Sequence, residues 1–328
     1  MMCYLRNYNL VTDPLVSIIV TSKNSELYIE ETLKSVIGQT YQNKEIIIID
    51  ANSKDSTLTK IQELQATDGF KSSFKISSEP DSGFHEGVCK GLNLASGEYI
   101  FTCAASDAFI DLNWIEKCVS FLQLHQDYSL VWGFSINKYE DTLRDISYPW
   151  LHRFGAPQGL AGFYYWLIFG TNFPEMNMGT RSEIMRKTFP KYVGNKSLKL
   201  DPWLEMMNNF HEGGYLAGHI DSIANFGRIH ENSITKKNQE EKRNNLFELR
   251  YHWKRMILFF KIVFKLKKNH GKNLDLKYKN VEILKIYYLY WCEIKNFYGA
   301  KSLFLPFAAL FFLKNVIKDT NLKGIFWR

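Results

Sequence analysis

Two apolar stretches of this sequence each end in an acidic residue. Residues 46–49 are four isoleucines followed by Asp50, and residues 99–105 are followed by Ser106 and Asp107. In an open α/β sheet, ligands bind outside the carboxyl ends of the strands. Acids at that edge can bind a ligand or accept a proton, although Asp is also a common turn residue. Asp50 and Asp107 are therefore candidates for chemistry.

The elements that must position these acids alternate between strand and helix. Residues 16–20 form a β-branched apolar run, typical of a strand that is covered on both faces. A helical stripe over 27–37, a strand over 45–50 and a helix through 58–64 follow. Because crossover connections are right-handed, this order predicts a doubly wound, Rossmann-like α/β fold with a mostly parallel sheet.

The pattern continues less regularly toward the middle of the chain. It predicts strands over 74–77, 130–134 and near 176–179, and helices over 84–95 and 114–125. Gly97, just after the first of these helices, is typical of a helix end.

The charge is divided unequally along the 328 residues. The chain carries 41 Lys and Arg and 34 Asp and Glu, a net charge of +7. Residues 236–328 hold 21 of the basic and 7 of the acidic residues, whereas residues 1–235 hold 20 basic and 27 acidic ones. The sequence therefore predicts an acidic body and a helical C-terminal extension rich in basic and aromatic residues.

The cysteines give no sign of a disulfide framework or a zinc site. Their number is odd and no two have CxxC spacing: Cys3, Cys89, Cys103, Cys118 and Cys292. This usage is typical of reduced thiols in a cytoplasmic protein. The first residues also lack the basic and apolar regions of a cleavable signal.

Several short motifs keep a recognisable order and spacing. They are Val-Ser-Ile-Ile-Val-Thr at 16–21, Ser-Val-Ile-Gly-Gln-Thr-Tyr at 35–41, the strand at 45–50, Asp-Ser-Thr at 55–57, Glu-Pro-Asp-Ser-Gly at 79–83, Lys-Gly at 90–91 and Ala-Ser-Gly-Glu at 95–98. In this series the chain resembles family 2 glycosyltransferases of the bacterial surface-polysaccharide type, which have the GT-A fold.

The resemblance implies a division into two domains. A GT-A catalytic domain would span 1–235, with a nucleotide-binding half at 14–110 and an acceptor half at 111–235. The helical extension at 236–328 would follow it.

The resemblance also implies contacts to a nucleotide-sugar donor. Thr21 and Ser22 would line the base and ribose pocket, and Asp50 would accept a hydrogen bond from the nucleobase. Asp81 would border the nucleotide. Lys90 would lie near a phosphate, although a solvated lysine on a helix is an equally good interpretation of it.

A diphosphate leaving group is commonly balanced by Mg²⁺ or Mn²⁺, which prefer carboxylate oxygens. The family's DxD-type metal motif falls here on Asp107. Ser106, the residue before it, would contact the nucleotide-sugar donor. The flanking residues Ala105 and Ala108 leave a single carboxylate.

A late segment, 226–233, resembles the part of the family that follows the last core strand. There His230 would be the second metal ligand, and Arg228 would clamp a phosphate.

Inverting transfer needs a base for the acceptor hydroxyl. The family's D-x-[DE]-L-W motif corresponds to residues 200–205, so Asp201 is the predicted base and Glu205 the second choice. Asp201 precedes Pro202, so it is also a candidate helix N-cap. His85 and Glu86 replace the Tyr-Asp common in relatives, and neither is predicted to be catalytic.

These features predict an inverting, metal-dependent glycosyltransferase. It would move a sugar, most simply from a UDP-sugar, to a glycan or polyprenyl-diphosphate-linked acceptor in O-antigen, capsule or exopolysaccharide synthesis. The alternative is a weakened relative that acts as a membrane-held sugar-nucleotide or glycan-binding scaffold.

The extension at 236–328 predicts peripheral attachment to the anionic inner face of the cell membrane. Its longest apolar run, 303–313, is too short to cross a bilayer. A helical subdomain that packs on the catalytic core is an alternative. Nucleic acid is a weaker candidate partner, because the basic residues alternate with long apolar side chains.

Overall fold

The computed structural model describes residues 13–67, 74–146, 176–191 and 202–230. These residues all belong to one of two compact units of the chain, the unit of Met1–Gly159 and Asn172–Arg243. The predicted boundary after residue 235 and the predicted extension lie outside the described residues. The division into domains therefore stays a prediction.

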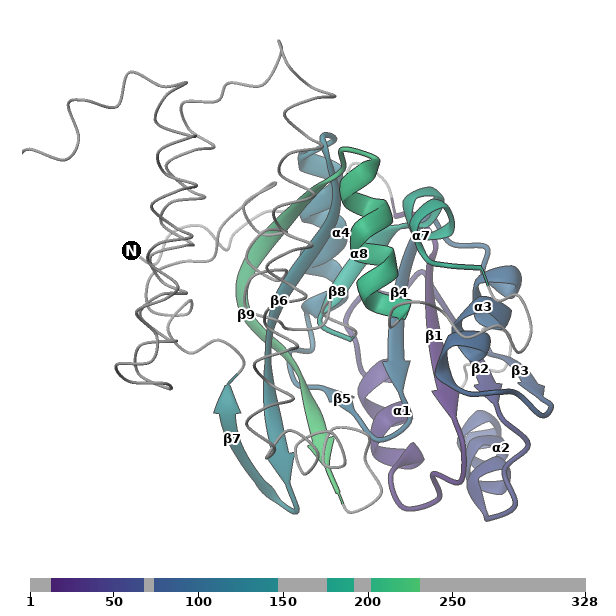
Figure 1. Cartoon of the computed structure of the whole chain (residues 1–328). Helices are drawn as coiled ribbons and strands as arrows, with labels where there is room; N and C mark the ends of the chain where they lie inside the picture. Colours follow the sequence, from purple (N-terminus) through teal and green to yellow (C-terminus); the bar gives the residue numbers. More distant parts are fainter. Residues whose placement is uncertain (1–12, 68–73, 147–175, 192–201, 231–328) are drawn as a thin grey trace, which may run out of the picture. The chain divides into compact units, whose positions relative to one another are not determined.

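Four parallel strands form the first part of the sheet, in the order β3-β2-β1-β4 (Figure 1). They are β1 (Val16–Ser22), β2 (Lys44–Asp50), β3 (Phe74–Ser78) and β4 (Tyr99–Ala104). Ser22 is the register partner of Asp50, and Asp50 is the partner of Ser78. The carboxyl ends of these strands therefore meet at one edge, as the sequence predicted.

Helices cover both faces of these strands. Ile18 and Ile48 lie in one apolar cluster with Leu33 of α1 (Ile29–Ile37) and with Ile61 of α2 (Thr57–Thr67). The next β1 side chain, Ile19, faces α3 (Phe84–Leu94), where a Cβ on Gly91 would lie 2.3 Å from Ile19 Cγ2. Successive side chains of a strand point to opposite faces, so the doubly wound α/β fold is confirmed.

The second part of the described chain extends the sheet with mixed directions. It contains β5 (Ala108–Phe109), α4 (Trp114–Leu124), β6 (Tyr128–Tyr139), β7 (Thr142–Ile146), β8 (Met178–Arg181), α7 (Ser182–Thr188), α8 (Pro202–Glu212) and β9 (Leu216–Ile229). Strand β8 is antiparallel to both β4 and β6, whereas β6 and β9 are parallel. This arrangement brings β9 to the carboxyl edge of β4.

Three sequence predictions need correction. Leu27 was expected in the apolar stripe of the first helix, but α1 begins at Ile29 and Leu27 is 77% exposed. The strand expected at 130–134 is the 12-residue β6. The segment from residue 226 does not follow the last core strand, because β9 continues to Ile229.

No helix within the described ranges is long and apolar enough to span a membrane.

Candidate functional site

Asp50 closes β2 and is completely buried at the carboxyl edge. Its Oδ1 accepts hydrogen bonds from the hydroxyls of Ser22 (2.9 Å) and Ser53 (2.5 Å). Its Oδ2 accepts from the Ser53 backbone N–H (2.9 Å) and the Ser78 hydroxyl (2.8 Å). A carboxylate has about four lone-pair sites, so its own chain saturates Asp50. The side chain ties together the ends of β1, β2 and β3.

This geometry gives no support to the predicted nucleobase contact of Asp50. A ligand N–H would have to displace one of four hydrogen bonds in a fully buried place. Ser22 is also buried, and its hydroxyl proton is donated to Asp50. Both residues are placed to hold the edge of the site together.

The loops after β1 and β2 are cross-linked along the same edge. Three successive backbone N–H groups of the first loop donate to side chains of the second: those of Asn24, Ser25 and Glu26 to Ser53, Thr57 and Asp55, respectively. Asn24 and Asn52 adopt positive φ angles of 47° and 55°, a region that Asn enters more readily than most residues. These hydrogen bonds therefore hold the two loops together at the carboxyl edge of the sheet.

Asp81 and Thr21, near the end of β1, both lie against Gly87 of α3. A Cβ on Gly87 would lie 3.1 Å from the Thr21 methyl group and 3.5 Å from Asp81 Oδ2, so α3 closes over both side chains. Burial raises the pKa of Asp81, and the hydrogen bond from the Gly83 N–H and the charge of Lys90 oppose this shift. The structure brings together two residues that were predicted to contact the nucleotide.

Lys90 is bound by groups around the start of its own helix. Its Nζ lies 3.2 Å from Glu79 and 3.1 Å from Glu86, and it donates to the Pro80 carbonyl at 3.1 Å. A phosphate would have to compete with two carboxylates for this lysine. The geometry thus favours the interpretation of Lys90 as a structural helix lysine.

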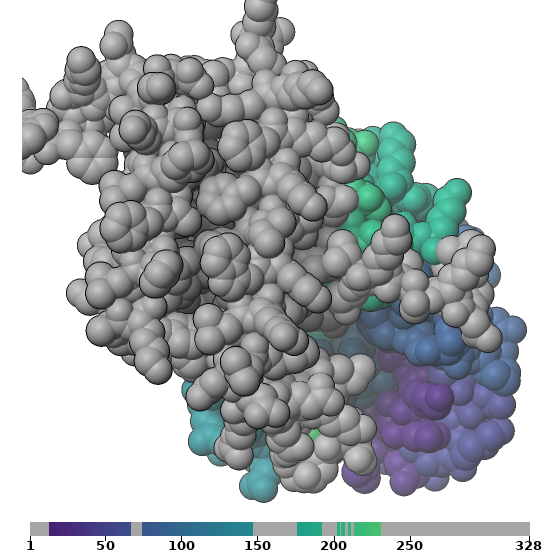
Figure 2. Space-filling model, viewed as in Figure 1, coloured from purple at the N-terminus to yellow at the C-terminus, as the bar shows by residue number. Residues whose placement is uncertain are grey.

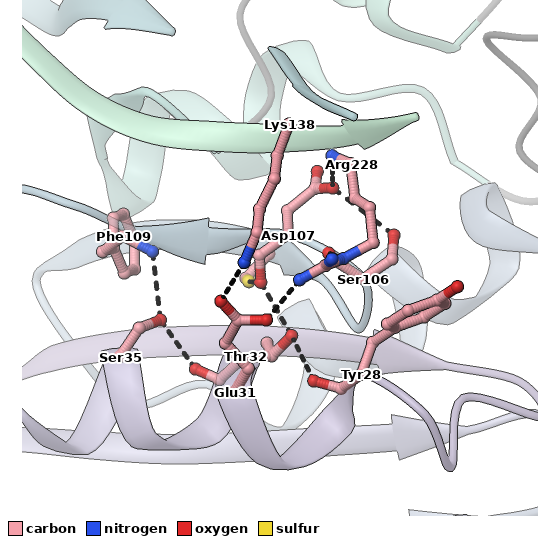
Figure 3. Close-up of polar contacts among 10 residues, drawn as sticks. Tyr28, Glu31, Thr32, Ser35, Ser106, Asp107, Phe109, Lys138 and Arg228 are labelled. Atoms are coloured by element: carbon pink, nitrogen blue, oxygen red, sulfur yellow. Dashed lines mark hydrogen bonds and ion pairs between the residues drawn. The ribbon is translucent and has the colours of Figure 1, made fainter. Parts of the chain in front are cut away.

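Asp107 follows β4 and is held from two sides (Figure 3). Its Oδ1 accepts from the backbone N–H of Arg228 in β9 at 2.9 Å, and its carbonyl accepts from the Thr32 hydroxyl in α1 at 2.7 Å. Burial raises the pKa of its carboxyl group to about 6, although the bond from Arg228 acts in the opposite direction. Asp107 therefore joins β4, α1 and β9 at this edge.

Two cations beside Asp107, Lys138 of β6 and Arg228 of β9, share the carboxylate of Glu31 in α1 (Figure 3). Lys138 Nζ lies 2.6 Å from Glu31 Oε1, and Arg228 Nη2 forms an ion pair with Glu31 Oε2. Arg228 Nε also donates to the Ser106 carbonyl at 3.1 Å. Sequence reasoning found Arg228 and Ser106 but missed Glu31 and Lys138, because these ion pairs join residues that are 107 and 197 positions apart.

Each of the two predicted metal ligands, Asp107 and His230, contacts another residue of the protein. The His230 ring packs against Tyr28, with 5.1 Å between ring centroids, and its pKa is lowered by burial and by the charge of Arg228. The described residues contain no group of three or more His, Cys, Asp or Glu side chains placed to hold a metal ion. Arg228 occupies one oxygen of Asp107 and brings a positive charge to the same place. Among the described residues, a single carboxylate with one oxygen already in a hydrogen bond is a poor donor set for Mg²⁺ or Mn²⁺, which take several oxygen ligands.

Asp201, the predicted base, lies just outside the described residues, but α8 begins at the next residue. Trp203 in its first turn is buried and packs against Phe84 and Phe189, with ring centroids 5.6 and 5.1 Å apart. Figure 2 shows atoms of α8, in green, next to those around α3, in blue. Because Phe84 directly follows the Asp81 loop, the first turn of α8 lies beside it. Glu205, one turn further, is half-buried.

The open α/β sheet, with polar side chains at its carboxyl edge and the start of α8 beside them, is a GT-A fold, the fold of the two solved structures described below. The chain belongs to glycosyl transferase family 2, since the family model with that description matches residues 17–187, more than half of the chain.

Two relatives illustrate the sequence similarity. A glycosyltransferase of unassigned role from Haemophilus influenzae is 41% identical over 110 residues, which cover 34% of this chain and 33% of that protein. A PGL/p-HBAD biosynthesis glycosyltransferase from Mycobacterium bovis is 25% identical over 169 residues, which cover 49% of this chain and 63% of that protein. The chain therefore spans less than two thirds of the length of either relative.

Two solved structures share the fold. TarS residues 1–349 from S. aureus, in complex with UDP-GlcNAc, matches 67% of this chain and 60% of its own at a TM-score of 0.51 and 18% identity. The mannosyltransferase PcManGT from Pyrobaculum calidifontis, in complex with GDP-Man and Mn²⁺, matches 94% of this chain and 83% of its own at a TM-score of 0.54 and 16% identity. At these identities the similarity establishes the fold alone.

Proposed function

We propose that this chain transfers a sugar, with inversion, from a nucleotide-sugar to a glycan or lipid-linked acceptor. One observation carries the proposal: the contact of Trp203 with Phe84 brings the first turn of α8 beside the loop of Asp81. The residue that we propose as a donor contact and a helix preceded by an acid thus lie together at the edge where α/β folds bind ligands. Family membership and the UDP-GlcNAc and GDP-Man complexes of the two structural neighbours support it.

The reaction is a single displacement at the anomeric carbon. The acceptor oxygen forms a bond to that carbon while the bond to the donor diphosphate breaks on the opposite face. The acceptor proton moves to Asp201, the proposed general base, with Glu205 as the second choice. The nucleoside diphosphate leaves with the electron pair of the broken bond.

The proposed donor contacts are Thr21, Asp81 and the cluster at Ser106 and Arg228. Asp50 and Ser22 act in this proposal as supports of the edge. The predicted Mg²⁺ or Mn²⁺ is supported by the Mn²⁺ in the mannosyltransferase complex. It is opposed by the donor set around Asp107, so we derive no step through a metal.

The proposed setting is surface polysaccharide assembly at the inner face of the cell membrane. Basic residues near an anionic surface contribute about 1 kcal/mol each, and residues 236–328 hold 21 Lys and Arg. Sedimentation of the full chain with anionic vesicles tests this attachment. A chain that stays in solution with vesicles at moderate salt contradicts it.

A second candidate function is a scaffold that binds sugar nucleotides without turnover. The observation in its favour is that Ala105 and Ala108 stand beside Asp107, where the family often has acids. A panel of UDP-, GDP- and dTDP-sugars with lipid-linked acceptors separates the two functions. Release of a nucleoside diphosphate, together with a product whose anomeric configuration is inverted relative to the donor, supports transfer. Binding without release of nucleotide from any donor supports the scaffold. A product that keeps the anomeric configuration of the donor contradicts inversion.

A further inference from the structure

We propose that Lys138 and Arg228, held together by Glu31, form a binding site for the diphosphate of the donor. This inference rests on the proposed function and deepens it. It assigns to two side chains the neutralisation of charge that a divalent cation supplies in sites with several carboxylates.

The first observation is the register of the two strands. Lys138 and Arg228 are direct partners in the parallel pair β6–β9. Like charges at directly opposite positions of a sheet are destabilising. Two cations are kept here side by side, at the edge where the sheet would bind a ligand.

The second observation is the charge balance of the pair. Two carboxylates lie beside the two cations: Glu31 pairs with both, with one oxygen for each, and Asp107 accepts a hydrogen bond from the backbone N–H of Arg228. Glu31 is 45% exposed, whereas the side chains of Lys138 and Arg228 are only 14% and 8% exposed. In this proposal the more exposed Glu31 carboxylate moves into solvent while the cations stay in place, and an incoming anion takes its position.

The third observation is that aromatic rings hold both cations in place, while only some of their N–H donors have acceptors among the described residues. The guanidinium of Arg228 lies 4.6 Å from the Tyr28 ring centroid, and Lys138 Nζ lies 4.6 Å from that of Phe226. Within the described part of the chain, two of the five N–H donors of Arg228 and one of the three of Lys138 have acceptors. We assign the donors that have no acceptor among the described residues to phosphate oxygens, for which Arg has a suitable fork geometry.

Lys138 and Arg228 lie at the end of the sheet where the proposed reaction would release the diphosphate. The Nε of Arg228 donates to the Ser106 carbonyl, and its backbone N–H donates to Asp107, so the pair is attached to the end of β4. Fixed cations at a developing negative charge stabilise it without reorganisation. The leaving diphosphate of the proposed reaction gains such charge.

The test is calorimetric titration of the full chain with inorganic diphosphate and with UDP and GDP, in EDTA. Lys138→Met is expected to weaken diphosphate binding at least tenfold, and Lys138→Arg to restore it. Glu31→Gln is expected to strengthen binding severalfold, because a competing negative charge is lost. A purely structural Glu31 would instead change stability and leave affinity unaltered.

Lys75→Met is the matched control. Lys75 also pairs with a carboxylate, Glu45 at 2.7 Å, but it is the second residue of β3, near the amino end of that strand. Equal affinity of the wild type and Lys138→Met overturns the inference, as does binding that requires added Mg²⁺ or Mn²⁺. These results leave the proposed function standing if sugar transfer is observed. Diphosphate binding without transfer from any donor would instead refute the proposed function and keep the anion site.

Discussion

The indole of Trp203 packs against the ring of Phe84, with 5.6 Å between their centroids. This contact joins the first turn of α8 to the first turn of α3. The candidate base precedes one helix and the candidate donor loop precedes the other. In the proposed function, the relative position of the two helix starts that carry these candidates therefore depends on the contact between the buried Trp203 and the half-buried Phe84.

Trp203→Phe is expected to lower kcat at least several-fold and to leave the donor KM unchanged, because a smaller ring lets α8 shift. Misplacement of a catalytic group by a fraction of the hydrogen-bond length slows transfer strongly. Trp114→Phe is the control, since Trp114 is also fully buried but lies in α4. Equal kcat losses in both variants would show that general destabilisation is the cause.

Asp50→Ala is expected to lower the free energy of unfolding by about 2–4 kcal/mol, because the buried residues Ser22 and Ser53 and the exposed Ser78 lose the acceptor of their hydrogen bonds. Urea unfolding followed by circular dichroism measures this loss. Asp127→Ala, at an exposed position, is the control, and its free energy of unfolding should stay within about 0.5 kcal/mol of that of the wild type. A stable Asp50→Ala chain that fails to bind nucleotide would instead support the predicted nucleobase contact.

Asp107→Asn is expected to change the pH dependence of stability. The native pKa of about 6 exceeds the ordinary 3.8, so the folded chain binds more protons than the unfolded chain between these values. The contribution of Asp107 to stability therefore falls as pH rises from 4 to 6. The free energy of unfolding of the variant should exceed that of the wild type by on the order of 2 kcal/mol at pH 7 and by little at pH 4.

Thermal or urea unfolding of both proteins across this pH range measures the difference. Asn keeps an acceptor for the Arg228 N–H, so the strand contact is preserved. A constant difference between the two proteins at all pH values would contradict the raised pKa.

Gly91→Ala is expected to destabilise the fold by about 1–3 kcal/mol, because the new methyl group would meet the buried Ile19 side chain. Helix propensity alone would favour Ala by about 1 kcal/mol. Gly227→Ala is the control, since a Cβ there meets nothing within 4 Å. A stabilised Gly91→Ala chain would show that α3 does not pack closely on β1.

The regular half of the fold was predictable from the sequence because its signals are local. Strands β1, β2 and β4 are continuous apolar runs, and Ser-Gly after α3 marks a helix end. Strand β9 was missed because Gly, His, Asp and Ser interrupt its apolar residues, and its pairing with β6 is what makes it a strand.

The site was predictable only where a residue lies at a strand end or within a motif. Asp50 and Asp107 were found as edge acids, but their partners decide what they do, and those partners come from distant elements. Glu31 resembles any exposed acid on a helix until Lys138 and Arg228 are folded against it. Charge pairing across 107 or more residues leaves no local pattern.

The most direct test of the proposed transfer is a comparison of the full chain with its Asp201→Asn variant. Both would be given the donor sugar that the wild type uses, and donor Kd and the rate of nucleoside diphosphate release would be measured. The proposal predicts an unchanged Kd and a kcat at least about 100-fold lower in the variant. Equal rates for the two chains, or no release by the wild type from any donor, would contradict it.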